Sequence, residues 1–320
     1  MNKRSLWVLV IYMSEFKPAN VELLNFWADG YVGHTSANGK DTGKKFLASI
    51  FEEGMESRVR GIRITSHFFP PRRFKVIRKI IEFLTLDQIK SLKKLHGYGT
   101  TKYHLQSKHL NVWYTSENLR PPLEEDFQAF LSHDLDTYDG RNIYLPIWAT
   151  RLGENIAESE KKQYEMLSSR TIKNIPEGNI CAIISNPEPI RMAYISQIQK
   201  LCNVDVYGAI GLPIDNKEEV LQKYKFNICF ENDEFPGYVT EKPIEAWLGG
   251  CIPIWRGLDT GKYLNEDAII NVTKLGFKKS IEEIDRILND ENEFMRVSCL
   301  PILQKGYDFQ SLRQTLSRIQ

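Results

Sequence analysis

The chain has 320 residues, of which 42% are hydrophobic and 26% charged, and its formal net charge is +1 at pH 7. This composition is typical of a globular protein, and the length fits two domains of roughly 150 residues each. The near-neutral charge argues against a general nucleic-acid-binding protein. No apolar run reaches the roughly 20 residues that a membrane-spanning helix needs.

Residues 1–150 are predicted to form one α/β domain. Its first apolar run, at 6–13, follows two basic residues as in a signal peptide. No small-residue cleavage site follows it, so we interpret it as a buried first strand and expect a cytoplasmic protein. An amphipathic stretch near 44–56 comes next, and further strands are expected at 60–65, 110–115 and 143–148.

A basic amphipathic helix is predicted within 72–95. Apolar residues such as Phe74, Ile77 and Ile81 recur there at helical spacing among many Lys and Arg residues. The favoured interpretation is a helix packed on the core with a solvated basic face. The alternative is peripheral contact with anionic lipid headgroups at the inner face of a membrane, beside a lipid-linked or lipopolysaccharide acceptor.

The second half of the chain alternates strands and helices more regularly. A charged, helix-bearing connection is expected at 151–178, a second Rossmann-like domain at 179–305, and a last helix within 306–320 that returns to the first domain. Such alternation predicts parallel sheets. The expected elements are strands at 180–185, 204–207, 226–230, 251–255 and 268–272 and helices at 189–202, 216–224, 240–248 and 280–290. All five cysteines lie in this half without CxxC spacing, and we expect free thiols.

The segment 225–257 carries the strongest functional signal. An apolar strand leads into a polar loop, and a helix opened by Thr240 and Glu241 ends at Gly249 and Gly250 before another strand. In such folds ligands bind at the carboxyl ends of the strands, against helix N-termini. The loop and the first helical turn offer side chains suited to a ribose, a base and a phosphate, which predicts a nucleotide-sugar site: Glu231, Asn232, Tyr238, Glu241 and Lys242.

Two basic residues are placed to bind a diphosphate. Lys242 lies in a first helical turn, where the helix dipole disfavours a cation unless an anion is bound nearby. Arg191 follows the strand at 180–184 and lies close to Pro189, which suits a helix start. Its guanidinium would then lie at the same sheet edge as Lys242. The alternatives are a surface ion pair for Arg191 and a solvated acidic loop with an ordinary cap for 231–242.

The sequences FNICFEN and GYVTEK, together with SNPEPIR upstream, resemble the bacterial α-1,3/α-1,4-fucosyltransferases of glycosyltransferase family ten. The resemblance is strong over 179–257 and moderate over 111–148. It implies an α/β GT-B fold with two Rossmann-like domains facing each other across a cleft. It also implies transfer of L-fucose from GDP-fucose with inversion and without a required metal or other cofactor.

By the same resemblance, Arg191 and Lys242 would bind the diphosphate and Glu241 the ribose or fucose hydroxyls. Asn232 and Tyr238 would complete the donor site. The chain departs from the family at Pro243, where an aliphatic residue is common, and at Arg256, which lies in a Trp-Arg-Gly ending instead of a Tyr-Trp-Gly-like one. With these departures, a GDP-sugar other than GDP-fucose stays an open alternative as the donor.

The catalytic base is expected in the first domain. Glu117 follows the strand at 111–115, and a carboxylate at the carboxyl end of a parallel strand can deprotonate an acceptor hydroxyl. The family has a similar T-G-E-N stretch whose Glu is the base, and Glu117 takes this role by resemblance, with Ser116 replacing the Gly. The alternative is a carboxylate that only anchors the turn.

Asp134-Leu135-Asp136 matches the DxD pattern of metal-dependent transferases, but we interpret these acids as structural and expect no essential metal. The expected partners are a GDP-sugar donor and a glycan acceptor, fucosylated α-1,3 or α-1,4 on GlcNAc or glucose, and no nucleic acid. Two alternatives stay open. One is a transferase of the same fold that uses another GDP-sugar, and the other is a non-catalytic carbohydrate-binding relative.

Overall fold

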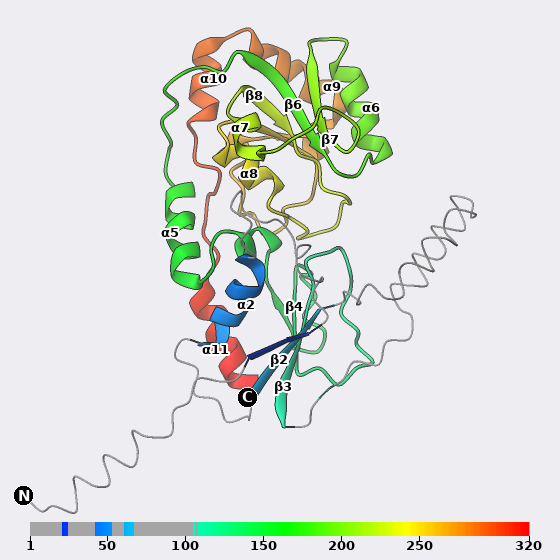
Figure 1. Ribbon diagram of the computed structural model, residues 1–320, viewed down its shortest axis with the longest axis vertical. Coiled ribbons are helices and arrows are strands. Elements are labelled where there is room, and N and C mark those ends of the chain that lie inside the picture. Colours follow the sequence, from blue (N-terminus) through cyan, green and yellow to red (C-terminus); the bar gives the residue numbers. More distant parts are fainter. Residues whose placement is uncertain (1–20, 25–41, 53–60, 67–104, 106–107, 320) are drawn as a thin grey trace, which may run out of the picture.

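The computed structural model describes residues 21–24, 42–52, 61–66, 105 and 108–319. The predicted strand at 6–13 and the predicted basic helix at 72–95 lie outside these residues. Two α/β units stacked along the long axis of the molecule make up the described part (Figure 1). Within it, no helix combines the length and the apolar character that crossing a membrane would require.

The first sheet has the strand order β1-β2-β3-β4-β5, and all its pairs are parallel. The strands are β1 (Val21–Leu24), β2 (Gly61–Ser66), β3 (His109–Tyr114), β4 (Ala129–Ser132) and β5 (Asn142–Tyr144). The strands expected at 60–65 and 110–115 are confirmed to within one residue as β2 and β3. Both are buried along nearly their whole length, as befits strands covered on two faces.

The strand expected at 143–148 is wrong in its second half. β5 ends at Tyr144, and a 3₁₀ helix, η1 (Ile147–Arg151), follows directly. Pro146 lies between them with φ −65°, and because it has no N–H it cannot extend the ladder of strand hydrogen bonds. The short strands β1 and β4 were not expected from the sequence.

The second sheet is also parallel throughout, in the order β10-β9-β8-β6-β7. Its strands are β6 (Gly178–Ile184), β7 (Val204–Gly208), β8 (Tyr224–Ile228), β9 (Ile252–Trp255) and β10 (Ile270–Asn271). The helices along this part of the chain are α6 (Pro189–Ile198), α7 (Lys217–Leu221), α8 (Lys242–Leu248), α9 (Val272–Leu288) and α10 (Glu291–Ser298). Apolar side chains such as Ile180, Phe226 and Ile284 join sheet and helices into one core.

Two expectations for this half need correction. The strand expected at 268–272 has only two residues, because Asn271 caps α9 by accepting the N–H of Lys274. The helix expected at 280–290 therefore starts much earlier, at Val272, and it is kinked at Gly276, where φ is +74°. All five cysteines lie in the described part and are free thiols, as expected.

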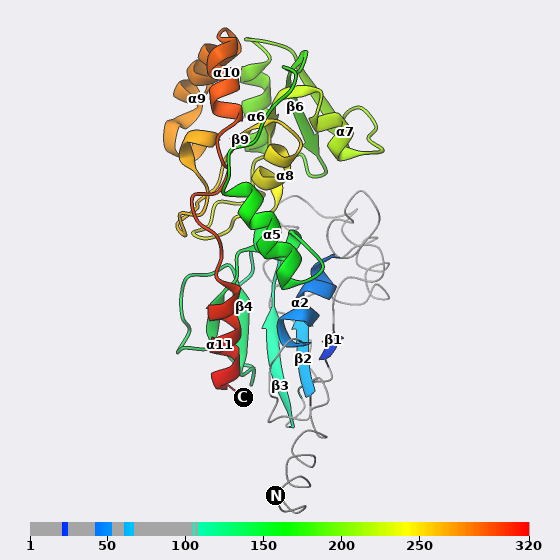
Figure 2. The same ribbon diagram turned by 90° about the vertical axis from the view of Figure 1, so that its left-hand side faces the viewer.

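Three helices lie near one another on one side of the structure (Figure 1): α2 (Thr42–Glu52), α5 (Ile156–Met166) and α11 (Phe309–Ile319). The last of these lies beside α2, far from the second sheet that precedes it in the chain (Figures 1 and 2). The rings of Phe46 and Phe309 are 5.3 Å apart, and Arg313 donates to the carbonyl of Ser49 at 3.0 Å. The two sheets are thus tied together by a chain end as well as by the connection at 151–178.

Candidate active site

The loop between β8 and α8 lies against the ends of β4 and β5 of the other sheet. Gly237 in this loop has φ +82°, and a β-carbon there would lie 2.4 Å from the carbonyl oxygen of His133. Tyr144 donates from its hydroxyl to the Gly237 carbonyl at 3.5 Å, and the N–H of Trp148 donates to the Val239 carbonyl at 3.3 Å. The approach is so close that only glycine fits at position 237.

A buried carboxylate, that of Glu231, organises the start of α8. One of its oxygens, Oε1, accepts the backbone N–H of Thr240 at 2.9 Å and the indole N–H of Trp255 at 3.1 Å. The other oxygen, Oε2, accepts the Thr240 hydroxyl at 2.7 Å and the Lys242 ammonium at 3.0 Å. Because these four donors occupy a side chain that is 0% exposed, Glu231 holds the loop together and presents no carboxylate surface to a ligand.

Lys242 is the first residue of α8, one residue later than the helix start expected at Glu241. Its backbone N–H lies 3.4 Å from the Thr240 hydroxyl, so the capping contact is weak. The side chain is 23% exposed. Burial lowers the pKa of Lys242, but the Glu231 and Glu241 carboxylates outweigh it and raise the pKa above its ordinary value. Lys242 therefore stays a cation at a helix N-terminus, with part of its surface open to an anion.

Arg191 lies in the first turn of α6 and is 5% exposed. Its guanidinium donates at 2.7 Å to the carbonyls of Asn186 and Phe230, and it lies 3.4 Å from the Asn232 side-chain oxygen. Burial lowers its pKa, and the neighbouring carboxylates of Glu188 and Glu231 oppose this. The two loops predicted to share one sheet edge do meet there, with Arg191 as the link between them.

Glu117 is exposed and lies in the turn after β3. The hydroxyl of Thr115 fixes this turn by donating to the Glu117 carbonyl at 3.0 Å and accepting its N–H at 3.1 Å. On the other side, the buried ring of Tyr238 belongs to the β8–α8 loop. Burial raises the pKa of the Tyr238 hydroxyl, and the charges of Glu117, Glu231 and Glu241 raise it further. The predicted base and the predicted donor-site residues therefore lie close enough to interact electrostatically.

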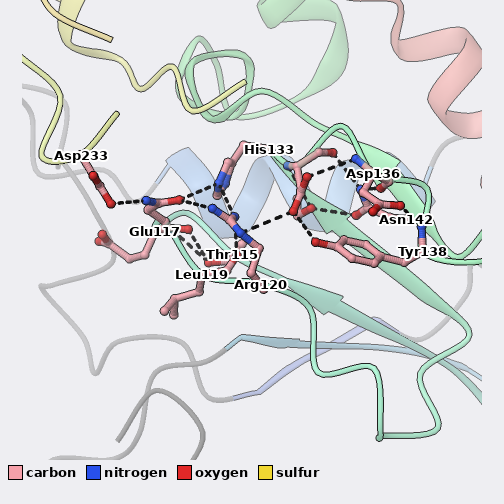
Figure 3. A network of polar contacts seen from close by, with 12 residues as sticks. Thr115, Glu117, Leu119, Arg120, His133, Asp136, Tyr138, Asn142 and Asp233 are labelled. Carbon is pink, nitrogen blue, oxygen red and sulfur yellow. Dashed lines mark hydrogen bonds and ion pairs between the residues drawn. The ribbon is translucent and has the colours of Figure 1, made fainter. Parts of the chain in front are cut away.

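A polar network that the sequence did not reveal joins these two groups of residues (Figure 3). Asn118 donates from its amide to the carboxylate of Asp233, and the two residues are 115 positions apart in the chain. Arg120 lies over the Phe235 ring, with its central carbon 3.2 Å from the ring centroid. Next to it, His133 is fully buried. Burial and the charge of Arg120 lower the pKa of His133 to about 4.

The acids of the DxD pattern support a turn. Asp134 accepts the Tyr138 hydroxyl and, at 3.1 Å, the N–H of Asp136. Asp136 in turn accepts the N–H of Tyr138 at 2.9 Å, next to two residues with positive φ, Tyr138 and Asp139. These bonds agree with the interpretation of both acids as structural. Within the described ranges, no cluster of three or more His, Cys, Asp or Glu side chains has the arrangement of a metal site.

Residues 176–297 match the model of a family described as glycosyltransferase family 10 (fucosyltransferase), C-terminal part. An α-(1,3)-fucosyltransferase of Helicobacter pylori is 30% identical, over 84% of this chain and 56% of the relative. The human 3-galactosyl-N-acetylglucosaminide 4-α-L-fucosyltransferase FUT3 is 34% identical, over 31% of this chain and 30% of its own length. The chain thus spans about half of the bacterial relative and less than a third of the human one.

Solved structures agree with this similarity at the level of the fold. A crystal structure of an α1,3-fucosyltransferase superposes with a TM-score of 0.65 at 20% identity, over 96% of this chain and 91% of that one. Another, of an α1,3-fucosyltransferase with GDP-fucose, gives 0.63 at 18% identity, over 96% and 92%. The predicted fold class, α/β of the GT-B type with two Rossmann-like units, is confirmed.

Proposed function

We propose that the protein transfers L-fucose from GDP-fucose to a hydroxyl of a glycan acceptor. The match of residues 176–297 to the glycosyltransferase family 10 model and the similarity to the Helicobacter pylori enzyme support this proposal. The observation that carries the proposal is the meeting of two elements from opposite sheets. One is the β8–α8 loop with its partly exposed cation Lys242, and the other is the turn with the exposed carboxylate Glu117. A nucleotide-sugar transferase needs both, a cation for the leaving diphosphate and a base for the acceptor.

In the proposed reaction, the Glu117 carboxylate accepts the proton of the acceptor hydroxyl. The acceptor oxygen then forms a bond to the anomeric carbon of fucose, and the bond from that carbon to the GDP oxygen breaks, with inversion of the anomeric centre. The negative charge that develops on GDP is balanced by Lys242 and by the positive end of α8. Fixed positive charge of this kind takes the place of a metal ion in the proposal, so no metal cofactor is required.

The roles of the other predicted residues follow from their positions. Asn232 is exposed at the loop edge, and Tyr238 and Glu241 are buried beside Lys242. We assign Glu241 to hydroxyl groups of the donor, and Asn232 and Tyr238 to the walls of the donor site. Arg191 reaches the same loop through the Phe230 carbonyl. Its contribution to diphosphate binding therefore includes holding the loop in place, besides its own charge.

For the acceptor we propose GlcNAc or glucose in a glycan, with an α-1,3 or α-1,4 linkage, because the relatives' names include both linkages. The first test is the product formed from GDP-fucose on a glycan array, with the linkage read by NMR. Transfer of fucose supports the proposal. No transfer to any acceptor, together with no hydrolysis of GDP-fucose, would refute it.

One contact favours a second candidate donor. Arg256, which departs from the family pattern, pairs with Glu234 of the β8–α8 loop, and Glu234 also accepts the Thr273 hydroxyl at 2.6 Å. Because this ion pair lies where the chain departs from the family pattern, we propose another GDP-sugar, such as GDP-mannose, as the second candidate donor. Hydrolysis rates measured in parallel for GDP-fucose and GDP-mannose would separate the two candidates.

The cellular setting is proposed from the sequence alone. We propose a cytoplasmic enzyme. Contact of the basic segment 72–95 with anionic lipid at the inner face of a membrane, beside a lipid-linked acceptor, is the alternative to a helix packed on the core. Binding to vesicles that contain anionic lipid, lost as salt is raised, would support this contact. No binding even at low salt would rule out the membrane contact without affecting the proposed reaction.

A further inference from the structure

The turn that carries Glu117 is closed by a guanidinium group, that of Arg120. This group donates at 2.7 Å to the side-chain oxygen of Asn118 and at 3.3 Å to the carbonyl of Leu119. It also lies 3.1 Å from Nε2 of His133, at the end of β4, and 3.5 Å from the carboxylate of Asp134. Arg120 therefore holds the turn closed and joins it to the end of β4.

The same guanidinium reaches the other unit of the molecule. Its flat face lies 3.2 Å from the centroid of the Phe235 ring, which belongs to the β8–α8 loop. Its bond to Asn118 also orients the Asn118 amide. Because the amide oxygen accepts from Arg120, the amide NH₂ is directed to Asp233 of the same loop. Both links from the turn to the loop thus depend on Arg120.

His133 contacts both Arg120 and the β8–α8 loop. Nε2 of His133 lies 3.1 Å from the Arg120 guanidinium and 3.3 Å from the Asn118 side-chain oxygen, so the ring contacts both residues of the turn. The ring packs edge to face against Tyr238 at 4.9 Å and against Phe235 at 5.8 Å. A neutral His133 can accept from Arg120, whereas a protonated one would repel it. The neutral imidazole therefore helps to hold Arg120 between the turn and the β8–α8 loop.

We propose that Arg120 is a positioning residue that sets where Glu117 stands relative to the donor loop, residues 231–238. It touches neither the donor sugar nor the reacting atoms. Instead, it makes the position of the base depend on the loop that holds the nucleotide sugar, so that the two halves of the site are assembled together. This inference rests on the proposed function, because it takes Glu117 as the base.

The kinetic test compares Arg120→Lys with a matched control, Arg141→Lys. Arg141 has the same kind of contacts, since it donates to the Leu123 carbonyl at 3.2 Å and lies 4.8 Å from the Phe130 ring centroid, but these partners belong to its own domain. A lysine keeps the charge but not the planar fork. We expect Arg120→Lys to lower kcat by roughly 10-fold or more, while its KM for GDP-fucose stays within about twofold of that of the unaltered protein. For Arg141→Lys, both kcat and KM should stay within about twofold. An unchanged kcat, or a KM that rises in proportion, would overturn the proposal.

The second test needs no turnover. Backbone hydrogen exchange is measured in both variants and in the unaltered protein. We expect Arg120→Lys to exchange faster in 115–120 and in 231–238 together, with 180–184 unchanged, and Arg141→Lys to leave all three segments unchanged. Faster exchange in 115–120 alone would mean that Arg120 only stabilises its own turn, and the proposal would fail. If the unaltered protein transferred no fucose, the proposed function would be refuted instead. The exchange result would still decide whether Arg120 joins the two segments.

Discussion

The ammonium group of Lys242 donates to the carboxylate of Glu231 at 3.0 Å, and this carboxylate is fully buried while Lys242 is 23% exposed. The two residues have different roles at the start of α8. Glu231 turns inward and binds the loop backbone, and Lys242 turns its remaining surface outward. A buried charge without a partner is costly, so the pair also explains why a lysine is tolerated at a helix N-terminus in the absence of a ligand.

Replacing Glu231 by glutamine should therefore destabilise the protein. Glutamine has the same shape but only one acceptor oxygen, so two of the four donors around it lose their acceptor whichever way the amide is turned. We expect the free energy of unfolding to fall by roughly 1–3 kcal/mol, measured by urea titration. Glu266→Gln is the matched control, since Glu266 pairs with Lys274 at the surface; it should change the stability by less than about 1 kcal/mol. Equal effects of the two variants would contradict the role of Glu231.

Replacing Lys242 by methionine should weaken the binding of GDP, because the loss of a diphosphate contact removes a charge-assisted interaction. Calorimetry should show an affinity lower by roughly 10-fold or more. Lys217→Met serves as the control, since Lys217 forms an ion pair with Glu245 of the same helix α8 but is itself the first residue of α7. If both variants bind GDP as the unaltered protein does, Lys242 is not a diphosphate ligand.

Replacing Gly237 by alanine should damage the contact between the two units. The new β-carbon would lie 2.4 Å from the His133 carbonyl oxygen, in a residue whose φ is +82°. Gly140→Ala is the control, because Gly140 has almost the same φ, +81°, and nothing within 4 Å of its β-carbon position. The backbone strain of roughly 1 kcal/mol is thus common to both, and thermal unfolding should show a further loss only for Gly237→Ala. The same loss in both would mean that the loop simply moves away from His133.

Much of the second unit could be predicted from the sequence, because its strands are continuous apolar runs that end in polar loops. The edge on which Arg191 and Lys242 lie follows from this pattern alone. The first unit was harder: β4 has four residues and β5 three, too few for a clear period. Pairings such as Asn118 with Asp233 join positions 115 residues apart, and no local pattern carries such information.

The roles of individual polar residues were also only partly predictable. An acidic residue in a polar loop, such as Glu231, is typical of a ligand-binding site. Its side chain is nevertheless buried among four donors of its own chain. Burial of a carboxylate depends on what packs around it in three dimensions, here Trp255 from the following strand. Arg120 and His133 have no sequence signal of their own, because their ring contacts with Phe235 and Tyr238 join them to a loop more than 100 residues later in the chain.

Acid should destabilise the protein through His133. Burial and Arg120 lower its pKa in the folded state to about 4, from 6.5. Between these two pH values the unfolded chain binds a proton that the folded chain does not, so this contribution to stability is complete above pH 6.5 and is lost as the pH falls to about 4. Over this whole pH range the free energy of unfolding falls by about 3 kcal/mol. Urea titrations at several pH values should show a shallower dependence for His133→Gln, and an unchanged dependence would contradict this account.

Glu117 is proposed as the base for an acceptor bound opposite the β8–α8 loop. Glu117→Gln keeps the size of the side chain and its exposed position but removes the negative charge that accepts the proton. We predict that kcat for fucosyl transfer from GDP-fucose falls by roughly 10²-fold or more, while the affinity for GDP stays within about twofold. A Glu117→Gln variant that turns over at the rate of the unaltered protein would contradict the account directly.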